Sequence, residues 1–318
     1  MAGAGELRIL RRRIRSVRST QKITRAMELI AASRITKARN RVEAARPYAQ
    51  MITRVIRDLA SEAEVTQHPL MQARSGANRV GVVVIASDRG LAGAYNTNVL
   101  RRAEQLIAEE RGLGHEVDLY TVGRKAEVYF RYRQVIPVEV FTGISDQPRY
   151  ADAVTVGEKV VQAYTADRID RVWLVYTDFR SALSQVTSVA KLLPVDPAPF
   201  EGGQAFPPQF MFEPDPASIL ERLIPRYVEH RLYAGLLESA ASEHASRQRA
   251  MKAATDNAGE IIEGLTREAN AARQAAITTE ISEIVGGAEA LSGEGDDPRP
   301  SVSRTDLAEI LSAEALSQ

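Results

Sequence analysis

The chain has 318 residues, of which 44% are hydrophobic and 26% charged, and its 41 basic and 41 acidic side chains cancel to a formal net charge of zero. This composition is typical of a soluble protein with room for two domains, or for one domain and an extended element. Because the chain has no cysteine, structural disulfides, thiolate zinc sites and thiol catalysis are excluded. No run of about 18 apolar residues occurs, so we expect any membrane association to come through a partner.

The first sixty residues are predicted to form one very long helix, because apolar residues recur at alternating spacings of three and four from Leu7 to Leu59. A straight helix would drift off such a stripe by roughly 20° per heptad, so the repeat is typical of a supercoiled helix. At about 1.5 Å per residue, the stretch 6–58 would extend on the order of 80 Å. We therefore expect residues 1–60 to form one strand of a coiled coil. The stripe consists of Leu7, Leu10, Ile14, Val17, Gln21, Thr24, Glu28, Ala31, Ile35, Ala38, Val42, Ala45, Ala49, Ile52, Ile56 and Leu59.

Three neighbouring positions of this stripe, Gln21, Thr24 and Glu28, are polar. We expect the apolar stripe to move over by one position here, to Ile23, Met27 and Ile30. Such a shift would free a polar patch that includes Lys22 and Arg25.

The same helix is strongly basic. Between Arg8 and Arg46 it has thirteen basic residues against two acidic ones, so this stretch carries a formal charge of +11. A stripe of this kind indicates an acidic partner, which could be nucleic acid, anionic lipid or a negatively charged protein surface, although a solvated helix flank is an alternative. The arginine-rich start also resembles a mitochondrial transit peptide, but the apolar repeat already runs through it, which favours a structural role.

The middle of the chain changes to the pattern of a sheet. Apolar runs at 80–86, 117–122 and 172–176 alternate with helical patterns at 95–111, 125–131 and 151–166, and 185–195 is a candidate edge strand. Strands that alternate with helices favour a mostly parallel, doubly wound sheet, here a Rossmann-like α/β domain over residues 80–211, joined to the first helix by a linker at 61–79.

No nucleotide fingerprint accompanies this predicted sheet. The segment from Asp88 to Gly93 matches neither G-x-G-x-x-G nor G-x-x-x-x-G-K-[ST], so no phosphate cradle is evident. We expect a plain strand-to-helix turn, in which Gly90 relaxes the backbone and Asp88 or Asn96 accepts hydrogen bonds from free amides.

Residues 212–291 are predicted to form a second long helix that pairs antiparallel with residues 1–60. Its stripe runs from Leu220 to Ala276, is rich in alanine, and has polar members that include His230 and His244. Residues 292–318 are predicted to be a flexible acidic tail with a short amphipathic segment around Leu307. The four histidines show no metal-ligand spacing, so we expect no metal, no cofactor and no catalytic residue.

Six segments of the chain carry a specific sequence pattern: Ser19–Ser33, Ser87–Asn96, Phe212–Pro216, Ala250–Asn257, Ala271–Thr278 and Glu280–Gly287. These segments closely resemble the gamma subunit of rotary F-type ATP synthases. The resemblance covers roughly residues 3–291 in order, and its long terminal motifs are highly specific.

The resemblance implies a central rotor shaft without catalytic activity of its own, because catalysis in this family belongs to the beta subunits. The shaft would couple proton-driven rotation of a c-subunit ring to conformational changes in beta for ATP synthesis, and would regulate ATPase activity and proton flow. The implied partners are a hexameric ring of alpha and beta subunits, an epsilon subunit and the c-ring, without nucleic acid. The implied location is the cytoplasmic face of a bacterial cell membrane, reached only through the complex.

The resemblance also implies roles for individual positions. Contacts with beta are expected at Lys22, Arg25, Met27, Arg273, Gln274 and Thr278. A foot near the c-ring is expected at Glu213 and Asp215. A bearing tip that turns in a hydrophobic sleeve is expected at Ile277, Ile281, Ile284 and Val285.

Two other classes of function compete with the rotor. A basic coiled-coil protein could bind nucleic acid with its +11 stripe, but no aromatic residue interleaves with that stripe before Tyr48, which leaves base stacking without support. A dinucleotide-binding enzyme would need the fingerprint that is missing after residue 86.

Overall fold

The computed structural model describes residues 2–60, 68–74, 76, 78–196, 213 and 215–292. The chain divides into two compact units. We call residues 19–259 the sheet unit, and residues 1–18 with 260–318 the terminal unit. The long helices α1 (Ala2–Ala60) and α5 (Pro216–Ser292) contribute to both.

The sheet unit contains five strands in the order β3-β2-β1-β4-β5. The pairings of β1 (Arg79–Ile85) with β2 (Glu116–Val122) and β4 (Arg171–Phe179) are parallel, as is that of β2 with β3 (Glu139–Phe141). Strand β5 (Gln185–Leu193) pairs antiparallel with β4 at the edge. The mostly parallel sheet with an added edge strand is therefore confirmed, whereas the short β3 has too weak an apolar pattern to be predicted.

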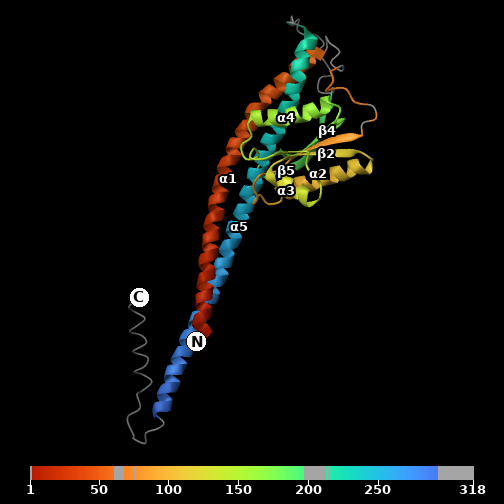
Figure 1. The fold of residues 1–318 in the computed structure, drawn as a ribbon. Coiled ribbons are helices and arrows are strands. Elements are labelled where there is room, and N and C mark those ends of the chain that lie inside the picture. The colour runs from red at the N-terminus through yellow and green to blue at the C-terminus, as the bar shows by residue number, and fades with distance from the viewer. Residues whose placement is uncertain are drawn as a thin grey trace. The chain divides into compact units, whose positions relative to one another are not determined.

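Helices cover both faces of this sheet, as Figure 1 shows for α4 on one side and α2 and α3 on the other. Side chains of β1 alternate between the two cores, since successive strand residues point to opposite faces. Val83 and Ile85 pack with α4 (Tyr150–Thr165), α5 and the end of α1. Val82 and Val84 pack with α2 (Tyr95–Gly112) and α3 (Arg124–Tyr132).

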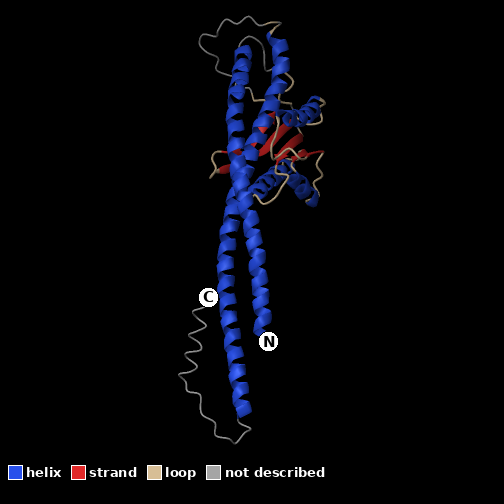
Figure 2. Cartoon of the chain, turned by 90° about the vertical axis from the view of Figure 1, so that its left-hand side faces the viewer, coloured by secondary structure: helices blue, strands red, loops and turns tan. Residues whose placement is uncertain are grey.

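Within the sheet unit, α1 and α5 run antiparallel and side by side (Figures 1 and 2). The hydroxyl groups of Thr24 and Thr255 contact each other. Further along α1, the ring centroids of Tyr48 and His230 lie 5.0 Å apart. Every position of the predicted stripe from Leu7 to Leu59 is buried or half-buried, as is every position of the stripe in α5. The periodicity therefore identified the packed faces of both helices.

The expected shift of the stripe at its polar positions is wrong. Ile23 and Ile30 are 58% and 54% exposed, whereas Glu28 is buried, with only 9% of its surface exposed. Gln21 and Thr24 stay in the interface because both form hydrogen bonds with Thr255 on α5. Polar pairing across the helices thus keeps the stripe on one face.

In the terminal unit, the start of α1 packs against α5 around a small apolar cluster of Leu10, Ile14 and Ala269. From Ile277 to Leu291 all residues of α5 are exposed within the described part of the chain. No helix of the described ranges is long and apolar enough to cross a membrane. The predicted tail at 292–318, apart from residue 292, and nine residues of the predicted linker, 61–67 with 75 and 77, lie outside the described residues.

Candidate functional site

Helix α5 packs across part of the crevice where a doubly wound sheet usually binds its ligand, and a cavity of about 330 Å³ lined by Gly93, Thr177 and Ser246 remains beside it. The chain leaves β1 toward β2 on one side and returns to β4 on the other, so the switch point lies at the carboxyl ends of β1 and β4. At this place Thr177 of β4 donates its backbone N–H to the hydroxyl of Ser239 at 3.3 Å, and the hydroxyl of Ser242 donates to the Thr177 carbonyl at 3.3 Å. Helix α5 therefore takes the polar contacts that a ligand would make.

Close approach of α5 to the sheet depends on Gly235. A Cβ atom at this position would lie 3.2 Å from Leu174 Cδ2 and 3.5 Å from Ile85 Cδ1. The absence of a side chain thus lets the helix backbone lie directly over β1 and β4.

The loop after β1 is a structural turn, as the sequence predicts. Asp88 accepts hydrogen bonds from the backbone N–H groups of Arg124 and Ser145, each at 3.1 Å, and Asn96 accepts one from the N–H of Ser87 at 3.0 Å. The left-handed backbone conformation falls on Leu91 and Gly93, however, and not on the expected Gly90.

Titration of Asp88 reflects these contacts. Burial raises the pKa of its carboxyl, but hydrogen bonds from the N–H groups of Gly143, Ser145 and Arg124 outweigh burial and hold the pKa below its usual range. The carboxylate is therefore ionised at neutral pH and anchors the loop through these hydrogen bonds.

Among the described residues no group of acidic or histidine side chains could hold a metal ion. His230 and His244 are buried in the helix pair, His115 pairs with Glu110, and His68 accepts the N–H of Leu70. Each described histidine is thus either buried between the helices or engaged in a contact with a neighbouring residue.

The first group of predicted contact residues lies on α1 in the sheet unit. Lys22 is exposed, and Arg25 is exposed while pairing with Glu28 through a 3.0 Å Nη1–Oε2 contact. Arg25 thereby supplies the counter-charge for the buried Glu28, a role that its spacing of three residues on a helix permits. Met27 is half-buried and lines a cavity of about 270 Å³ beside the loop after β1.

The second group lies on α5 in the terminal unit. Arg273, Gln274 and Thr278 are all exposed, and the Thr278 hydroxyl donates to the Gln274 carbonyl one turn earlier at 3.0 Å. Gln274 and Thr278 share one face of the helix because four residues separate them, whereas Arg273 lies about 100° around the helix from Gln274.

The predicted bearing tip is an exposed apolar stripe on the same helix. Ile277, Ile281, Ile284 and Val285 are 45%, 53%, 67% and 52% exposed. Large apolar side chains that leave this much surface in water are typical of a surface that is covered in an assembly.

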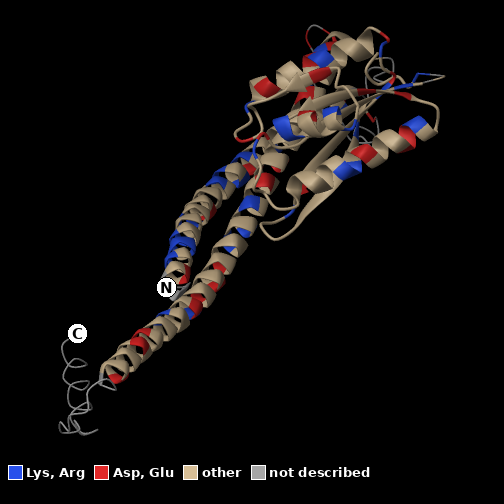
Figure 3. Ribbon diagram, turned by 60° about the horizontal axis from the view of Figure 1, so that its bottom comes forward, with Lys and Arg blue, Asp and Glu red and all other residues tan. Residues whose placement is uncertain are grey.

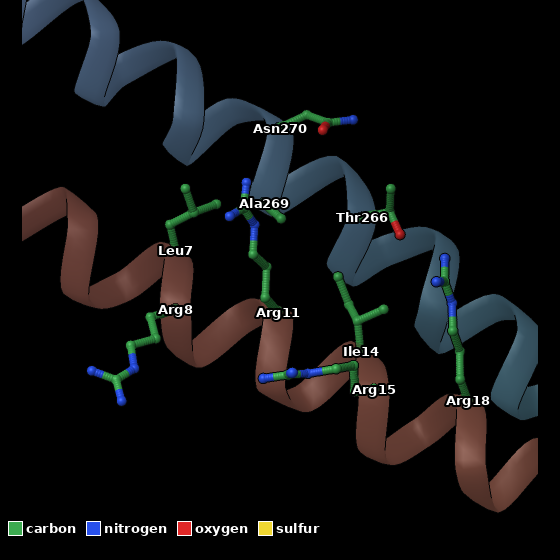
Figure 4. Close-up of a pocket in the computed structure, with 9 residues that line it drawn as sticks. All are labelled: Leu7, Arg8, Arg11, Ile14, Arg15, Arg18, Thr266, Ala269 and Asn270. Atoms are coloured by element: carbon green, nitrogen blue, oxygen red, sulfur yellow. The ribbon is translucent and has the colours of Figure 1, made fainter.

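A basic groove faces solvent elsewhere in the terminal unit. Its volume is about 770 Å³, and Leu7 and Ile14 of α1 point toward α5 in it (Figure 4). Lys and Arg residues, blue on the ribbon, are frequent along this start of α1 (Figure 3). None of the arginines that line the groove forms an ion pair with a described residue. These arginines are Arg8, Arg11, Arg15 and Arg18.

The predicted foot residues precede α5. Glu213 is exposed, and Asp215 caps the helix, because its carboxylate accepts the Ser218 N–H at 2.9 Å and the Ser218 hydroxyl at 2.7 Å. These hydrogen bonds from Ser218 lower the pKa of Asp215. Phe212 and Pro214, which belong to the same sequence motif, lie outside the described residues.

Sequence reasoning missed one polar cluster. Arg34 on α1 forms an ion pair with Asp146, a residue of the loop before α4, and His244 and Arg247 on α5 adjoin it. In the sequence, Arg34 is one of the residues of the basic stripe and His244 is a polar position of the α5 stripe. No sequence pattern distinguishes Asp146 from other residues of its loop.

Comparison with known proteins fits the two long helices and the central sheet. A family model described as ATP synthase matches residues 6–291. The ATP synthase gamma chain of Frankia casuarinae is 54% identical over 297 residues, covering 91% of this chain and 99% of that one. The ATP synthase gamma chain of Saccharopolyspora erythraea is 50% identical, covering 92% and 99% of the two chains.

Solved structures agree. The central stalk and c-ring structure of the Tetrahymena thermophila mitochondrial ATP synthase contains a chain that is 25% identical, with a TM-score of 0.56 over 73% of this chain and 99% of that chain. A chain of the Euglena gracilis mitochondrial ATP synthase, 16% identical, matches the fold with a TM-score of 0.65 over 94% of this chain and 99% of its own length. None of these similarities supports a nucleic-acid-binding protein. The chain belongs to the ATP synthase gamma-chain family, whose members are non-catalytic central rotor subunits.

Proposed function

We propose that this rotor subunit works through three exposed surfaces, which press on partners while the helix pair between them stays packed. What we call the beta-contact surface has two separate parts, Lys22, Arg25 and Met27 in the sheet unit and Arg273, Gln274 and Thr278 in the terminal unit. The bearing tip consists of Ile277, Ile281, Ile284 and Val285, and the foot of Glu213 and Asp215. The observation that supports the proposal is that the proposed contact residues and the stripe residues differ in solvent exposure. All of these side chains except Met27 are exposed, whereas the stripe positions of both helices are buried or half-buried.

Charge and shape fit the partners that the family resemblance implies. Exposed Lys22 and Arg273 would meet carboxylates of beta subunits, because an arginine fork pairs with a carboxylate through two hydrogen bonds. The apolar tip would turn in a hydrophobic sleeve of the ring of alpha and beta subunits. The foot would stand on the c-ring, with an epsilon subunit beside it, on the cytoplasmic face of a bacterial membrane.

The helix pair would act as a coiled-coil shaft. Supercoiling is expected because a buried stripe with an average spacing of 3.5 can face one partner over this length only if the helices wind around each other. We further propose five functional segments: the first strand at 1–60, a linker at 61–79, the α/β domain at 80–211, the second strand at 212–291, and a tail at 292–318.

The test of the beta-contact surface is charge reversal in the reconstituted complex. Lys22→Glu is the cleaner variant, since reversal of Arg25 would also place a second carboxylate beside Glu28. Lys37→Glu, an exposed lysine of α1 outside the proposed surface, is the matched control. We expect Lys22→Glu to lower torque and ATP hydrolysis while the control retains both.

The second flank is tested in the same way. Arg273→Glu should impair rotation, and Arg267→Glu, another exposed arginine of α5, should not. Unchanged torque and hydrolysis in both Lys22→Glu and Arg273→Glu would refute the proposed beta-contact surface.

A further inference from the structure

In the sheet unit, a polar junction connects α1, the loop before α4 and α5. Arg34 of α1 forms an ion pair with Asp146, in which its Nη1 contacts both carboxylate oxygens. On α5, His244 Nε2 lies 3.1 Å from the backbone carbonyl oxygen of the same Asp146. Asp146 therefore contacts both long helices, although it belongs to the α/β layer.

The roles of the His244 nitrogens follow from their partners. A carbonyl oxygen can only accept a hydrogen bond, so Nε2 donates to Asp146. A guanidinium can only donate, so Nδ1 accepts from Arg247 Nη1 at 3.5 Å. Burial lowers the pKa of His244, which is consistent with this neutral ring bridging the two residues.

Arg247 extends the junction to the loop after β1. Its Nη2 donates to the Gly90 carbonyl at 3.2 Å and to Glu243 Oε1, one helical turn away, at 2.6 Å. Glu243 is buried, with 1% of its surface exposed, so the arginine is held by a charge that water does not screen. Helix α5 is thus tied to both loops at the carboxyl edge of the sheet.

A second layer fixes Asp146 in place. The carboxylate of Asp88 accepts the Ser145 N–H at 3.1 Å, and the Ser145 hydroxyl accepts the Asp88 N–H at 2.9 Å. This reciprocal pair orders the residue directly before Asp146, so the acidic side chain that meets Arg34 is presented by a braced loop. By contrast, two other ion pairs of α1, Arg39–Glu43 and Arg54–Asp58, lie within the helix itself.

We propose that Asp146 is a positioning residue that locks α1 and α5 to the α/β layer, so that sheet and helix pair turn together under load. A rotor that bears load between its ends must resist sliding of one helix past the other, and apolar packing resists sliding less specifically than a fixed ion pair does. The role of the junction depends on the rotor function of the family and not on the proposed contact surfaces.

The test uses the assembled enzyme in membrane vesicles, with ATP hydrolysis and ATP-driven proton pumping measured on the same preparation. Asp146→Asn and Arg34→Gln each remove the ion pair, Asp146→Glu retains the carboxylate, and Arg39→Gln removes an exposed pair of the same helix as a control. We expect hydrolysis to stay within about twofold of wild type and protons pumped per ATP to fall about twofold in the first two variants. The double variant should be no worse than either single one, because both changes remove one interaction.

Two further results are expected. Asp146→Glu should restore pumping at least in part, and Arg39→Gln should match wild type. The proposal is overturned if pumping per ATP is unchanged in Asp146→Asn and Arg34→Gln, if Arg39→Gln lowers it equally, or if every loss simply tracks the amount of assembled complex. Failure of the beta-contact surface would appear instead as normal torque in Lys22→Glu, which leaves the junction intact.

Discussion

The hydroxyl groups of Thr24 and Thr255 lie 2.8 Å apart across the two long helices, although 231 residues separate them in the sequence. Each hydroxyl also has a carbonyl acceptor one turn earlier in its own helix: Thr255 has the Met251 carbonyl at 2.8 Å, and Thr24 has the Gln21 carbonyl at 3.0 Å. Either hydroxyl can therefore donate to the other, and the Gln21 side-chain amide donates a further hydrogen bond to the Thr255 carbonyl at 3.3 Å.

Removal of one hydroxyl of this pair should destabilise the chain. Thr24→Val would remove the Thr255 hydroxyl's partner across the helices, and we expect a loss of about 1 kcal/mol in the free energy of unfolding. The Thr24→Val/Thr255→Val double variant should lose less than the sum of the single variants, because the second change removes the stranded partner. Urea unfolding of the full chain gives these values.

Thr278→Val is the control, since Thr278 is exposed and bonds only within its own helix. Strictly additive losses would contradict a direct contact between Thr24 and Thr255.

Replacing two glycines of α5 by alanine should change the stability of the chain in opposite directions. A Cβ at Gly235 would press on Leu174 and Ile85, so Gly235→Ala should cost about 1–3 kcal/mol through overpacking against the sheet. Nothing lies within 4 Å of a Cβ at Gly264, so Gly264→Ala should stabilise the chain by about 1 kcal/mol through helix propensity. Thermal unfolding followed by circular dichroism distinguishes the two, and a gain at Gly235 would contradict the close approach of α5 to the sheet.

Periodicity alone could predict the packed faces of both helices, because a long amphipathic stripe is a local property of the sequence. It could not predict that Gln21 and Thr24 stay in that stripe, since their partner Thr255 is more than 200 residues away. The Arg34–Asp146 pair could not be predicted for the same reason, because no local pattern distinguishes Asp146 from other loop carboxylates. The exposed tip and flanks were found through the family resemblance and not through spacing.

Glu238 gives a prediction for pH dependence. Burial raises the pKa of this α5 carboxyl from its ordinary 4.5 to about 7, and Asp178 adds to the increase while Arg46 and Arg231 oppose it. A carboxyl whose pKa is raised by folding favours the folded state below pH 4.5, and this contribution is lost as the pH rises to about 7. A pKa shift corresponds to about 1.4 kcal/mol of folding free energy per unit when the group is fully buried. Because part of the Glu238 side chain is solvated, we expect a smaller total loss of stability, about 1–2 kcal/mol over this pH range.

Glu238→Gln should remove this dependence, because the amide stays neutral. The variant should be more stable than wild type at pH 8 and nearly equal to it at pH 5 when the free energy of unfolding is measured in urea. An equal difference at both pH values would show that Glu238 is charged throughout.

Asp215 allows the capping role to be separated from the proposed contact with the c-ring. Asp215→Ala removes both hydrogen bonds to Ser218 and should speed amide hydrogen exchange at Ser218, because the first turn of α5 then lacks its cap. Asp215→Asn keeps an acceptor oxygen and should restore slow exchange while it removes the negative charge. The pKa of Asp215 is lowered by these bonds, so protonation at acidic pH should weaken the wild-type cap but leave the Asn cap unchanged. If Asp215→Asn has normal exchange but lowers ATP synthesis in the assembled enzyme, the charge itself serves the foot; normal synthesis in Asp215→Asn would assign Asp215 to the helix cap alone and leave Glu213 as the acidic residue of the foot.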